Sequence, residues 1–454
     1  MRFSSFSELI GHFAAHTPEA PALVSFARGA LHTVTYAELA RAVERRADEL
    51  CRGGAPGCLA LIPDAEAPEE TVIGLFAAVR AGAQVALIDE SVPEELLPSL
   101  LDYVDADALM CEESLREELS GSLCARRVTD GAGRILFFTS GTTERSKAVV
   151  LTERSLCASA WNGSALLPLS PDDTLLCQLP LSHVFGFVCG LLWGLSCGAC
   201  VALGRGARHY ADDPALFRPT AVSVVPLLLG FLLKAGCLNE ELKLILVGAG
   251  DCPPQLLAAA KARGARVSFG YGLTETSSGV ALSLGDDAYA MTVCPDDTVT
   301  LADDGEILID VPSCVMQGYY KRPADTAAAM AGGVLHTGDL GRFDENGLLH
   351  ITGRKKDVLV LPDGTKLFLP EAEAQISALL GPCDCALALR AGRVVLAVSG
   401  DPRSDAELLE KLRPYQDERP RGQQIAAVIR ADRPLPRTAT GKIKRWELQG
   451  RIEA

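Results

Sequence analysis

Short apolar runs alternate with amphipathic segments along most of the chain. The apolar run LALIPDA is followed by EETVIGLFAAVRAGA, which has helical spacing, and then by the apolar run QVALIDE. KLILVGAG, PPQLLAAAKARGA and RVSFGYG repeat the same order further along the chain. Strands that alternate with helices favour parallel sheets covered by helices. The pattern therefore predicts an α/β fold.

The alternation breaks near residue 357. The segment GRKKD, Gly353 to Asp357, is a short charged run between apolar segments, and the residues after it are more mixed. At 454 residues the chain exceeds the length at which a single hydrophobic core keeps growing. We therefore expect a large N-terminal domain of parallel-rich sheets covered by helices over residues 1–356, and a small α+β domain over residues 357–454.

Composition and charge exclude some classes of function. The hydrophobic fraction of 48% and the charged fraction of 22% are ordinary for a soluble globular protein. The net charge of −15 argues against a broadly basic surface that binds nucleic acid. The 15 cysteines show no regular spacing, and the start MRFSSFSELIGHF lacks the features of a signal peptide. These features predict a cytoplasmic protein with reduced thiols.

One uncharged stretch, Leu181–Leu203, is long enough to span a bilayer. It holds a histidine, two serines and several glycines, and no basic cluster flanks it closely. We therefore predict a buried helix beside a ligand cleft and no membrane span.

The most informative run is FFTSGTTERSKAVVLT, from Phe137 to Thr152. Small residues allow a tight backbone with inward N–H groups, clustered hydroxyls add donors, and Lys147 adds positive charge. That combination suits a polyphosphate, although a hydroxyl-rich hairpin with no ligand remains an alternative on these residues alone. The run does not match the Walker pattern G-x-x-x-x-G-K-[ST].

The run resembles the phosphate loop TSGTTGxPKG of the AMP-binding, adenylate-forming superfamily, which includes acyl-CoA synthetases, luciferases and peptide-synthetase adenylation domains. The resemblance implies ATP phosphate contacts for Thr139, Ser140, Gly141, Thr142, Thr143 and Lys147. The loop departs from the family pattern at Glu144, Ser146 and Ala148. Because of these departures, a nucleotide-binding protein with weak turnover stays open as a function of a different class.

Further segments resemble the family in the family's order. PLSHVFG resembles the motif that lines the carboxylate pocket, which implies substrate contacts for His183 and Phe185. GYGLTETS implies that Tyr271 stacks on adenine beside Gly272, that Thr274 contacts phosphate and that Glu275 binds Mg²⁺. Nucleotide contacts are also expected in the loop formed by Gly248, Ala249 and Gly250.

The resemblance continues to the end of the chain. HTGDL supplies Asp339, whose carboxylate accepts the ribose hydroxyls, and GRKKD supplies Arg354 as a second ribose contact. Asp357 matches the hinge about which the family's mobile C-terminal domain rotates. PRTATGKIKRWEL supplies Lys442, the adenylation lysine that bridges the carboxylate and the α-phosphate. The segment Gly305–Pro323 also matches, and we interpret it as mainly structural.

Together these motifs imply an ATP-dependent acid–thiol ligase that uses Mg²⁺, with Lys442, Glu275 and Thr274 as catalytic residues. The enzyme would form an acyl-AMP with release of pyrophosphate and then transfer the acyl group to CoA. The segment Pro180–Gly190 holds no acidic residue, which disfavours an α-amino acid substrate. Its apolar surroundings suit a fatty or an aryl acid. The segment LVLPDGTKLFLPEAE resembles fatty acyl-CoA synthetases, which implies a fatty acyl substrate. An aryl acid, and the phosphopantetheine of an acyl carrier protein as acceptor, remain alternatives.

Overall fold

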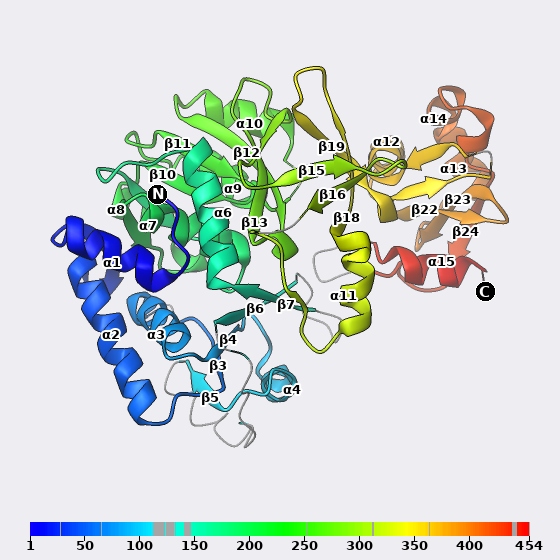
Figure 1. The fold of residues 1–454 in the computed structure, drawn as a ribbon. Coiled ribbons are helices and arrows are strands. Elements are labelled where there is room, and N and C mark those ends of the chain that lie inside the picture. Colours follow the sequence, from blue (N-terminus) through cyan, green and yellow to red (C-terminus); the bar gives the residue numbers. More distant parts are fainter. Residues whose placement is uncertain are drawn as a thin grey trace. The chain divides into compact units, whose positions relative to one another are not determined.

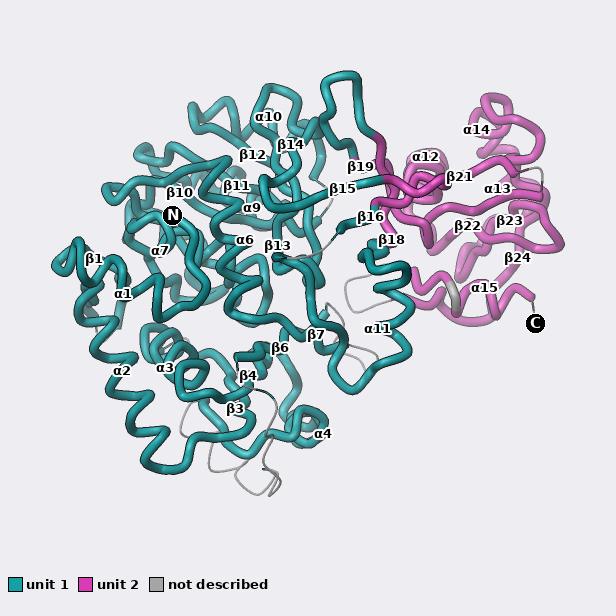
Figure 2. The backbone as a smooth tube through the Cα atoms, in the orientation of Figure 1, with its two compact units in different colours: residues 1–300, 308–337, 343–350 teal, residues 301–307, 338–342, 351–454 magenta. Residues whose placement is uncertain are grey.

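The structure, a computed structural model, divides into two units, which Figure 2 shows in two colours. Unit 1 comprises Met1–Thr300, Leu308–Thr337 and Phe343–His350, and unit 2 comprises Leu301–Ile307, Gly338–Arg342 and Ile351–Ala454. The domain boundary expected before Asp357 lies within the last segment of unit 2. The structure describes all residues except 28, 65, 112–122, 124–130, 132, 140–146, 251, 311–312, 363, 438–442 and 454, and except the side chain of residue 446.

Unit 1 contains a six-stranded sheet in the order β17-β7-β6-β4-β3-β5 (Figure 1). Strands β5, β3, β4 and β6 are parallel, and β7 returns antiparallel to β6. The predicted strand–helix–strand unit is therefore confirmed, because α3 (Pro68–Arg80) connects β3 to the parallel strand β4. The strands are β3 (Cys58–Leu61), β4 (Gln84–Leu87), β5 (Ala108–Met110), β6 (Arg134–Phe138), β7 (Ala148–Thr152) and β17 (Gly318–Tyr319).

A second sheet runs through unit 1 in the order β14-β13-β12-β11-β10-β8-β9-β1-β2. Its central strands β9, β8, β10, β11 and β12 are parallel, and β13 returns antiparallel to β12. All residues of β10 and β11 are buried, as expected for parallel strands that are covered on both faces. The strands are β1 (Pro21–Ala27), β2 (Ala30–Thr35), β8 (Thr174–Cys177), β9 (Cys200–Leu203), β10 (Ala221–Val224), β11 (Leu244–Val247), β12 (Arg266–Leu273), β13 (Ser278–Ser283) and β14 (Met291–Val293).

Four more strands continue this order and carry residues of both units. They are β15 (Thr298–Leu301), β16 (Glu306–Asp310), β18 (Val334–Phe343) and β19 (Leu349–Arg354). The other α-helices described in unit 1 are α1 (Phe6–His16), α2 (Tyr36–Arg52), α4 (Leu97–Tyr103), α6 (Glu153–Leu166), α7 (Trp193–Ser196), α8 (Asp213–Phe217), α9 (Pro226–Ala235), α10 (Pro254–Lys261) and α11 (Pro323–Ala329).

Helix α3 is buried between elements of both sheets. Every residue from Thr71 to Val79 is buried, and the helix contacts β3 and β4 of the six-stranded sheet as well as β1 of the second sheet. A helix that is apolar on all sides is stable only in such an interior position. The helix thereby links the two sheets into one core.

The uncharged stretch Leu181–Leu203 contains a buried helical segment, as its composition predicted, but the helix does not fill the whole stretch. It contains the π-helix η3 (Gly186–Leu192), the short helix α7 and the strand β9. Gly198 lies between α7 and β9 with a φ of 74°, a conformation in which glycine lacks the steric penalty of other residues, so it turns the chain there. Among the described helices, none is long and apolar enough to cross a membrane.

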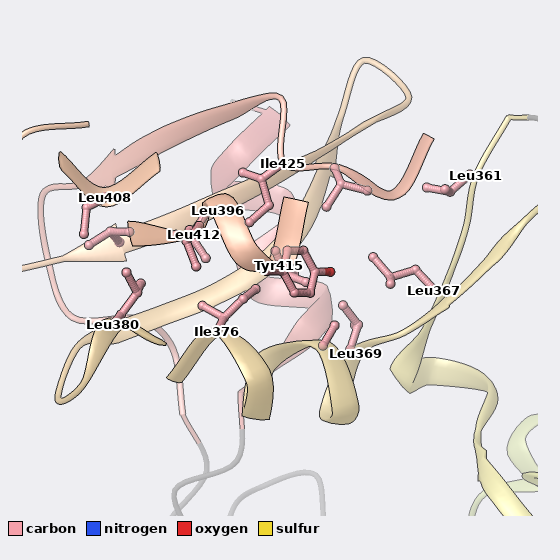
Figure 3. Close-up of a cluster of buried hydrophobic side chains, with 14 residues drawn as sticks. Leu361, Leu367, Leu369, Ile376, Leu380, Leu396, Leu408, Leu412, Tyr415 and Ile425 are labelled. Carbon is pink, nitrogen blue, oxygen red and sulfur yellow. The ribbon is translucent and has the colours of Figure 1, made fainter. Parts of the chain in front are cut away.

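Unit 2 has its own hydrophobic core, shown in Figure 3. Leu369 and Ile376 from α12 (Leu369–Leu380) pack with Leu396 from β23 and Leu408 from α13. Its further elements are β20 (Val358–Val360), β21 (Lys366–Phe368), β22 (Asp384–Arg390), β23 (Arg393–Ser399), β24 (Ala427–Ala431), α13 (Asp405–Lys411), α14 (Arg413–Asp417) and α15 (Arg445–Glu453). A separate core is the property that allows a segment to behave as a domain of its own.

This core makes a quantitative expectation possible. Leu396 is fully buried, so Leu396→Ala removes packed methyl groups and leaves a cavity, which costs about 2–5 kcal/mol. The free energy of opening that hydrogen exchange measures for the β22–β24 amides should therefore fall by about that amount. Val360→Ala is the matched control, because Val360 is 58% exposed, and it should change the same amides little. Equal effects of the two substitutions would contradict the proposed core.

Candidate functional site

The two ends of the predicted phosphate loop are held together by the hairpin of β6 and β7. The backbone N–H of Thr139 donates to the carbonyl of Lys147 at 3.0 Å, and the backbone N–H of Lys147 donates to Thr139 Oγ1 at 3.2 Å. The next pair along, Phe138 and Ala148, is in β-register. The other loop residues of the sequence analysis, Ser140, Gly141, Thr142, Thr143, Glu144 and Ser146, lie outside the described residues.

Lys147 contacts two side chains from a distant part of the sequence. Its Nζ lies 3.0 Å from Asp325 Oδ1, in the first turn of α11, and 4.4 Å from the centre of the Tyr319 ring. A lysine over an aromatic face gains a cation–π attraction in addition to its ion pair. The predicted phosphate lysine is therefore neutralised by an acid that the sequence analysis did not identify.

Tyr319 also reaches the predicted metal ligand. Its hydroxyl donates to Glu275 Oε1 at 2.7 Å, and the backbone N–H of Met316 donates to the Glu275 carbonyl at 2.8 Å. Burial raises the pKa of Tyr319 well above its ordinary value, and the neighbouring Glu275 raises it further, so the hydroxyl keeps its proton. Tyr319 thus lies between Lys147 and Glu275 and contacts both.

Strand β17 fixes this position of Tyr319. Gly318 and Tyr319 pair with Val150 and Val149 of β7. Gly318 has a φ of 146°, and a Cβ there would approach Thr326 Cγ2 to 2.7 Å. The strand therefore requires glycine before Tyr319, and its pairing with β7 brings the tyrosine next to the phosphate hairpin.

Thr274 and Glu275 lie on a tight turn after β12. The turn contains the 3₁₀-helix η5 (Thr274–Thr276), and the N–H of Leu273 donates to Thr276 Oγ1 at 2.9 Å. A Cβ on Gly272 would lie 1.7 Å from the carbonyl oxygen of Ser278, so only glycine allows this reversal. The pairing of β12 with β13 shifts between Tyr271 and Gly272. Such irregularities are common next to active sites.

The loop of Gly248, Ala249 and Gly250 follows the carboxyl end of β11. Ala249 has a φ of 61°, and a Cβ on Gly248 would meet the Phe185 ring at 3.0 Å. The predicted nucleotide loop and the predicted acid-pocket residue Phe185 are therefore in direct contact. Ligands of parallel α/β sheets usually bind at these carboxyl ends.

His183 is half exposed and pairs with a residue that the sequence analysis missed. Its Nε2 lies 3.3 Å from Asp89 Oδ2, and the Ser182 hydroxyl donates to the same carboxylate at 2.6 Å. Asp89 follows β4 of the six-stranded sheet, whereas His183 follows β8 of the second sheet. This contact joins the carboxyl ends of strands from the two sheets.

An apolar cavity of about 20 Å³ lies behind Phe185 in unit 1. It is lined by η3 through Val188 and Cys189, by Trp193, and by Leu246 and Gly279 from β11 and β13. Phe185 packs against the same cluster as Trp193 and Leu246. The interior next to the predicted acid pocket is therefore apolar.

The predicted ribose contacts lie in unit 2. Arg354 Nε is 2.9 Å from Asp339 Oδ1, and Asp339 is almost fully buried. Nearby, Glu306 accepts hydrogen bonds from Lys355 Nζ and from the N–H of Gly338, both at 2.9 Å. A carboxylate is an acceptor-only group, which suits it to pairing with Arg354 and to binding hydroxyls.

Two further residues predicted to act in the reaction, Asp357 and Lys442, also belong to unit 2. Asp357 ends the 3₁₀-helix η7 (Lys355–Asp357), directly before β20. Lys442, the predicted adenylation lysine, lies outside the described residues.

Glu275 is the carboxylate predicted to bind a metal ion. Within the described part of the chain, no group of three or more His, Cys, Asp or Glu side chains could hold a metal ion. Mg²⁺ is commonly bound by one or two carboxylates together with substrate phosphates and water, so Glu275 fits that kind of site.

Three residues with contacts to the predicted site were not identified from the sequence: Asp89, Tyr319 and Asp325. Asp89 ends the apolar run QVALID, and an acid at the carboxyl end of a parallel strand could have marked it as a candidate. Tyr319 lies within the segment that was interpreted as structural. No sequence signal links Asp325 to Lys147, because 177 positions separate two residues brought together only by β17 and α11.

Comparison with known proteins supports the fold and the family. A family model described as AMP-binding enzyme matches residues 131–320. The 2-succinylbenzoate–CoA ligase of Listeria monocytogenes serotype 4b is 30% identical over 335 residues, 70% of this chain and 69% of that ligase. The long-chain-fatty-acid–CoA ligase FadD15 of Mycobacterium bovis is 30% identical over 319 residues, 58% of this chain and 52% of that ligase. The match thus spans about half the length of the fatty-acid ligase.

A solved structure shows the same fold. The o-succinylbenzoate CoA synthetase of Bacillus subtilis, in complex with ATP and magnesium ion, superimposes with a TM-score of 0.77 at 23% identity over 98% of both chains. The predicted α/β fold and the predicted family are therefore confirmed. The ordered motifs, the fold and the relatives together show that this chain belongs to the AMP-binding family of adenylate-forming enzymes, in which its matched relatives are acid–CoA ligases.

Proposed function

We propose that the protein is an acid–CoA ligase that activates an apolar carboxylic acid as its acyl-AMP. The arrangement of Lys147, Tyr319 and Glu275 beside the phosphate hairpin carries this proposal. It offers a cation for phosphate and a carboxylate for Mg²⁺ on either side of one tyrosine. Relatives named as CoA ligases support the same reaction.

In the first half-reaction a carboxylate oxygen attacks the α-phosphorus of ATP, and pyrophosphate leaves. Lys147 would bind the outer phosphates together with the Thr139–Lys147 loop, and Glu275 would hold Mg²⁺. The metal shields phosphate charge when it is bound. Lys442 would bridge the acid and the α-phosphate, where charge develops, and loss of such a contact typically costs about a hundredfold or more in rate. The B. subtilis relative with ATP and magnesium supports these cofactors.

Residues of unit 2 would bind the ribose and allow the change between the two half-reactions. Asp339, oriented by Arg354, would accept the ribose hydroxyls. Asp357 would serve as the hinge about which the C-terminal domain rotates. The rotation would move Lys442 away after adenylation and let the thiol of CoA reach the acyl-AMP. The thiol then attacks the acyl carbon and AMP leaves.

The relatives favour an aryl acid over a long fatty chain. The 2-succinylbenzoate–CoA ligase of L. monocytogenes is matched over 69% of its length, whereas FadD15 is matched over 52%. A fatty acyl substrate stays the second candidate, because FadD15 is named as a long-chain-fatty-acid ligase at the same identity of 30%.

Pyrophosphate release with a panel of acids tests the proposed function. We expect release with benzoate-type acids and little with acids longer than about ten carbons, since chain volume grows with each methylene. Lys442→Ala should remove acid-dependent ATP–pyrophosphate exchange and leave the fold intact. If ATP binds but none of the acids in the panel causes pyrophosphate release, the result would instead favour a nucleotide-binding protein without turnover.

Asp325 should weaken nucleotide binding, because it competes with phosphate for Lys147. Exposed ion pairs are worth roughly 0.2–1 kcal/mol, so Asp325→Asn should tighten Mg²⁺–ATP binding about two- to fivefold at low salt. The gain should shrink as salt screens the charges. Calorimetric titration measures both effects.

The matched control is Asp105→Asn. Asp105 also pairs with a lysine beside tyrosine rings, since Lys321 Nζ lies 2.8 Å from Asp105 Oδ2 and 5.3 Å from the centre of the Tyr320 ring. Its ion pair is with Lys321 and not with Lys147, so its substitution should leave ATP affinity unchanged. Equal affinity in Asp325→Asn and wild type would refute the competition.

A further inference from the structure

The contact between the two sheets points to a base for the second half-reaction. We propose that His183 Nδ1 accepts the proton of the attacking thiol and that Asp89 is the positioning residue that holds the imidazole for this task. The inference rests on the proposed function, because it assigns roles in the thiol step of that reaction.

Asp89 is a well-supported anion. The hydroxyl of Ser182 and the backbone N–H of Ser91 donate to its carboxylate at 2.6 and 2.9 Å, and the Ser91 hydroxyl donates as well. Burial alone would raise the pKa of Asp89, but these hydrogen bonds and the nearby His183 lower it overall. Only 19% of the Asp89 side chain is exposed, compared with 50% of the His183 side chain.

The carboxylate selects one tautomer of His183. Nε2 lies 3.3 Å from Asp89 Oδ2, and an anionic acceptor there favours the proton on Nε2. Nδ1 then carries the lone pair, and among the described residues none forms an ion pair or hydrogen bond with it. Because half of the side chain is exposed, a ligand can reach this nitrogen and a proton can later pass to solvent.

The backbone around His183 is rigid. The N–H of His183 donates to the Pro180 carbonyl at 3.2 Å, and the His183 carbonyl accepts from Phe187 at 2.9 Å. A Cβ on Gly186 would lie 2.3 Å from the same Pro180 oxygen, so this close approach requires glycine. The π-helix η3 begins at Gly186, and such helices are frequent at functional sites.

The chemistry requires the thiol to come close to this histidine. The acyl carbon under attack belongs to the acid, and Phe185, two residues from His183, borders both the nucleotide loop at Gly248 and the apolar cluster around the cavity. A thiol that reaches this carbon therefore arrives near the His183 ring. A free thiol has a pKa of about 8.5, so only a few per cent is thiolate at neutral pH and a base is useful.

The step balances without another reactant. The S–C bond forms while the C–O bond to AMP breaks, and AMP leaves with that electron pair. The S–H proton moves to Nδ1, and Asp89 stabilises the resulting imidazolium as the buried acid does in a serine hydrolase triad. Glu90 and Tyr210 are further titratable groups close to Asp89, and burial raises the pKa of both.

The substitution Asp89→Asn tests whether Asp89 positions the His183 base in the thiol step. An asparagine keeps the shape but removes the charge that selects the tautomer. With preformed acyl-AMP in a single turnover, we expect thioester formation to fall about a hundredfold or more at pH 7, as for other losses of general-base catalysis. Acid-dependent ATP–pyrophosphate exchange should stay within about threefold of wild type, because adenylation does not need this base.

The pH profile excludes a merely structural effect. As pH rises past the thiol pKa of about 8.5, the thiol ionises without a base. The ratio of the wild-type to the Asp89→Asn rate of thioester formation should therefore fall at least about tenfold between pH 7 and 9.5. His183→Gln should show the same narrowing in the thiol step. A deficit that is constant with pH, or equal losses in both half-reactions, would overturn the proposal.

Asp173→Asn is the matched control. Asp173 precedes β8, whereas His183 follows it, and Asp173 likewise accepts hydrogen bonds from serine and threonine hydroxyls. The substitution Asp173→Asn should leave the ratio of the thioester-formation rate to the ATP–pyrophosphate exchange rate unchanged. If wild type forms no acyl-AMP with any acid, the proposed function fails; if exchange is normal and Asp89→Asn transfers the acyl group at the wild-type rate, only the assignment of the base fails.

Discussion

The pairing of the short strand β17 with β7 is the constraint on which the phosphate side of the site depends. Without it, Tyr319 would not lie between Lys147 and Glu275, which come from the hairpin and from the turn after β12. The pairing in turn requires Gly318, whose φ of 146° excludes ordinary side chains. Gly318 and the two β17–β7 residue pairs thus determine the position of Tyr319 between Lys147 and Glu275, which are predicted to bind phosphate and Mg²⁺.

The acid side depends on a second close approach. Gly186 allows η3 to begin directly against the Pro180 carbonyl, and this fixes the turn that carries His183 and Phe185. Asp89 anchors that turn from the other sheet. The turn therefore links the end of β4, the end of β8 and the loop after β11, where strands of both sheets leave space for ligands. Helix α3, buried between elements of both sheets, keeps these ends in place.

Local features of the sequence predicted much of this arrangement. The apolar runs around α3 and α10 predicted parallel strands because the alternation of strand and helix leaves few other folds. The extent of the buried helix in Leu181–Leu203 was not predicted, because hydrophobicity alone does not report the turn at Gly198. Contacts between distant segments were harder to foresee. Asp325 and Lys147 meet through tertiary packing, and nothing in either local sequence marks the pair. The hydroxyl and imidazole partners of Asp89 were hidden for the same reason.

The route of one oxygen atom tests the central claim most directly. The acid that releases most pyrophosphate would be labelled with ¹⁸O in its carboxylate and incubated with ATP, Mg²⁺ and CoA, and the AMP formed would be analysed by mass spectrometry. Attack of the carboxylate on the α-phosphorus transfers one labelled oxygen to AMP. We expect AMP with one ¹⁸O atom; unlabelled AMP, or ADP together with labelled phosphate, would contradict an acyl-adenylate mechanism.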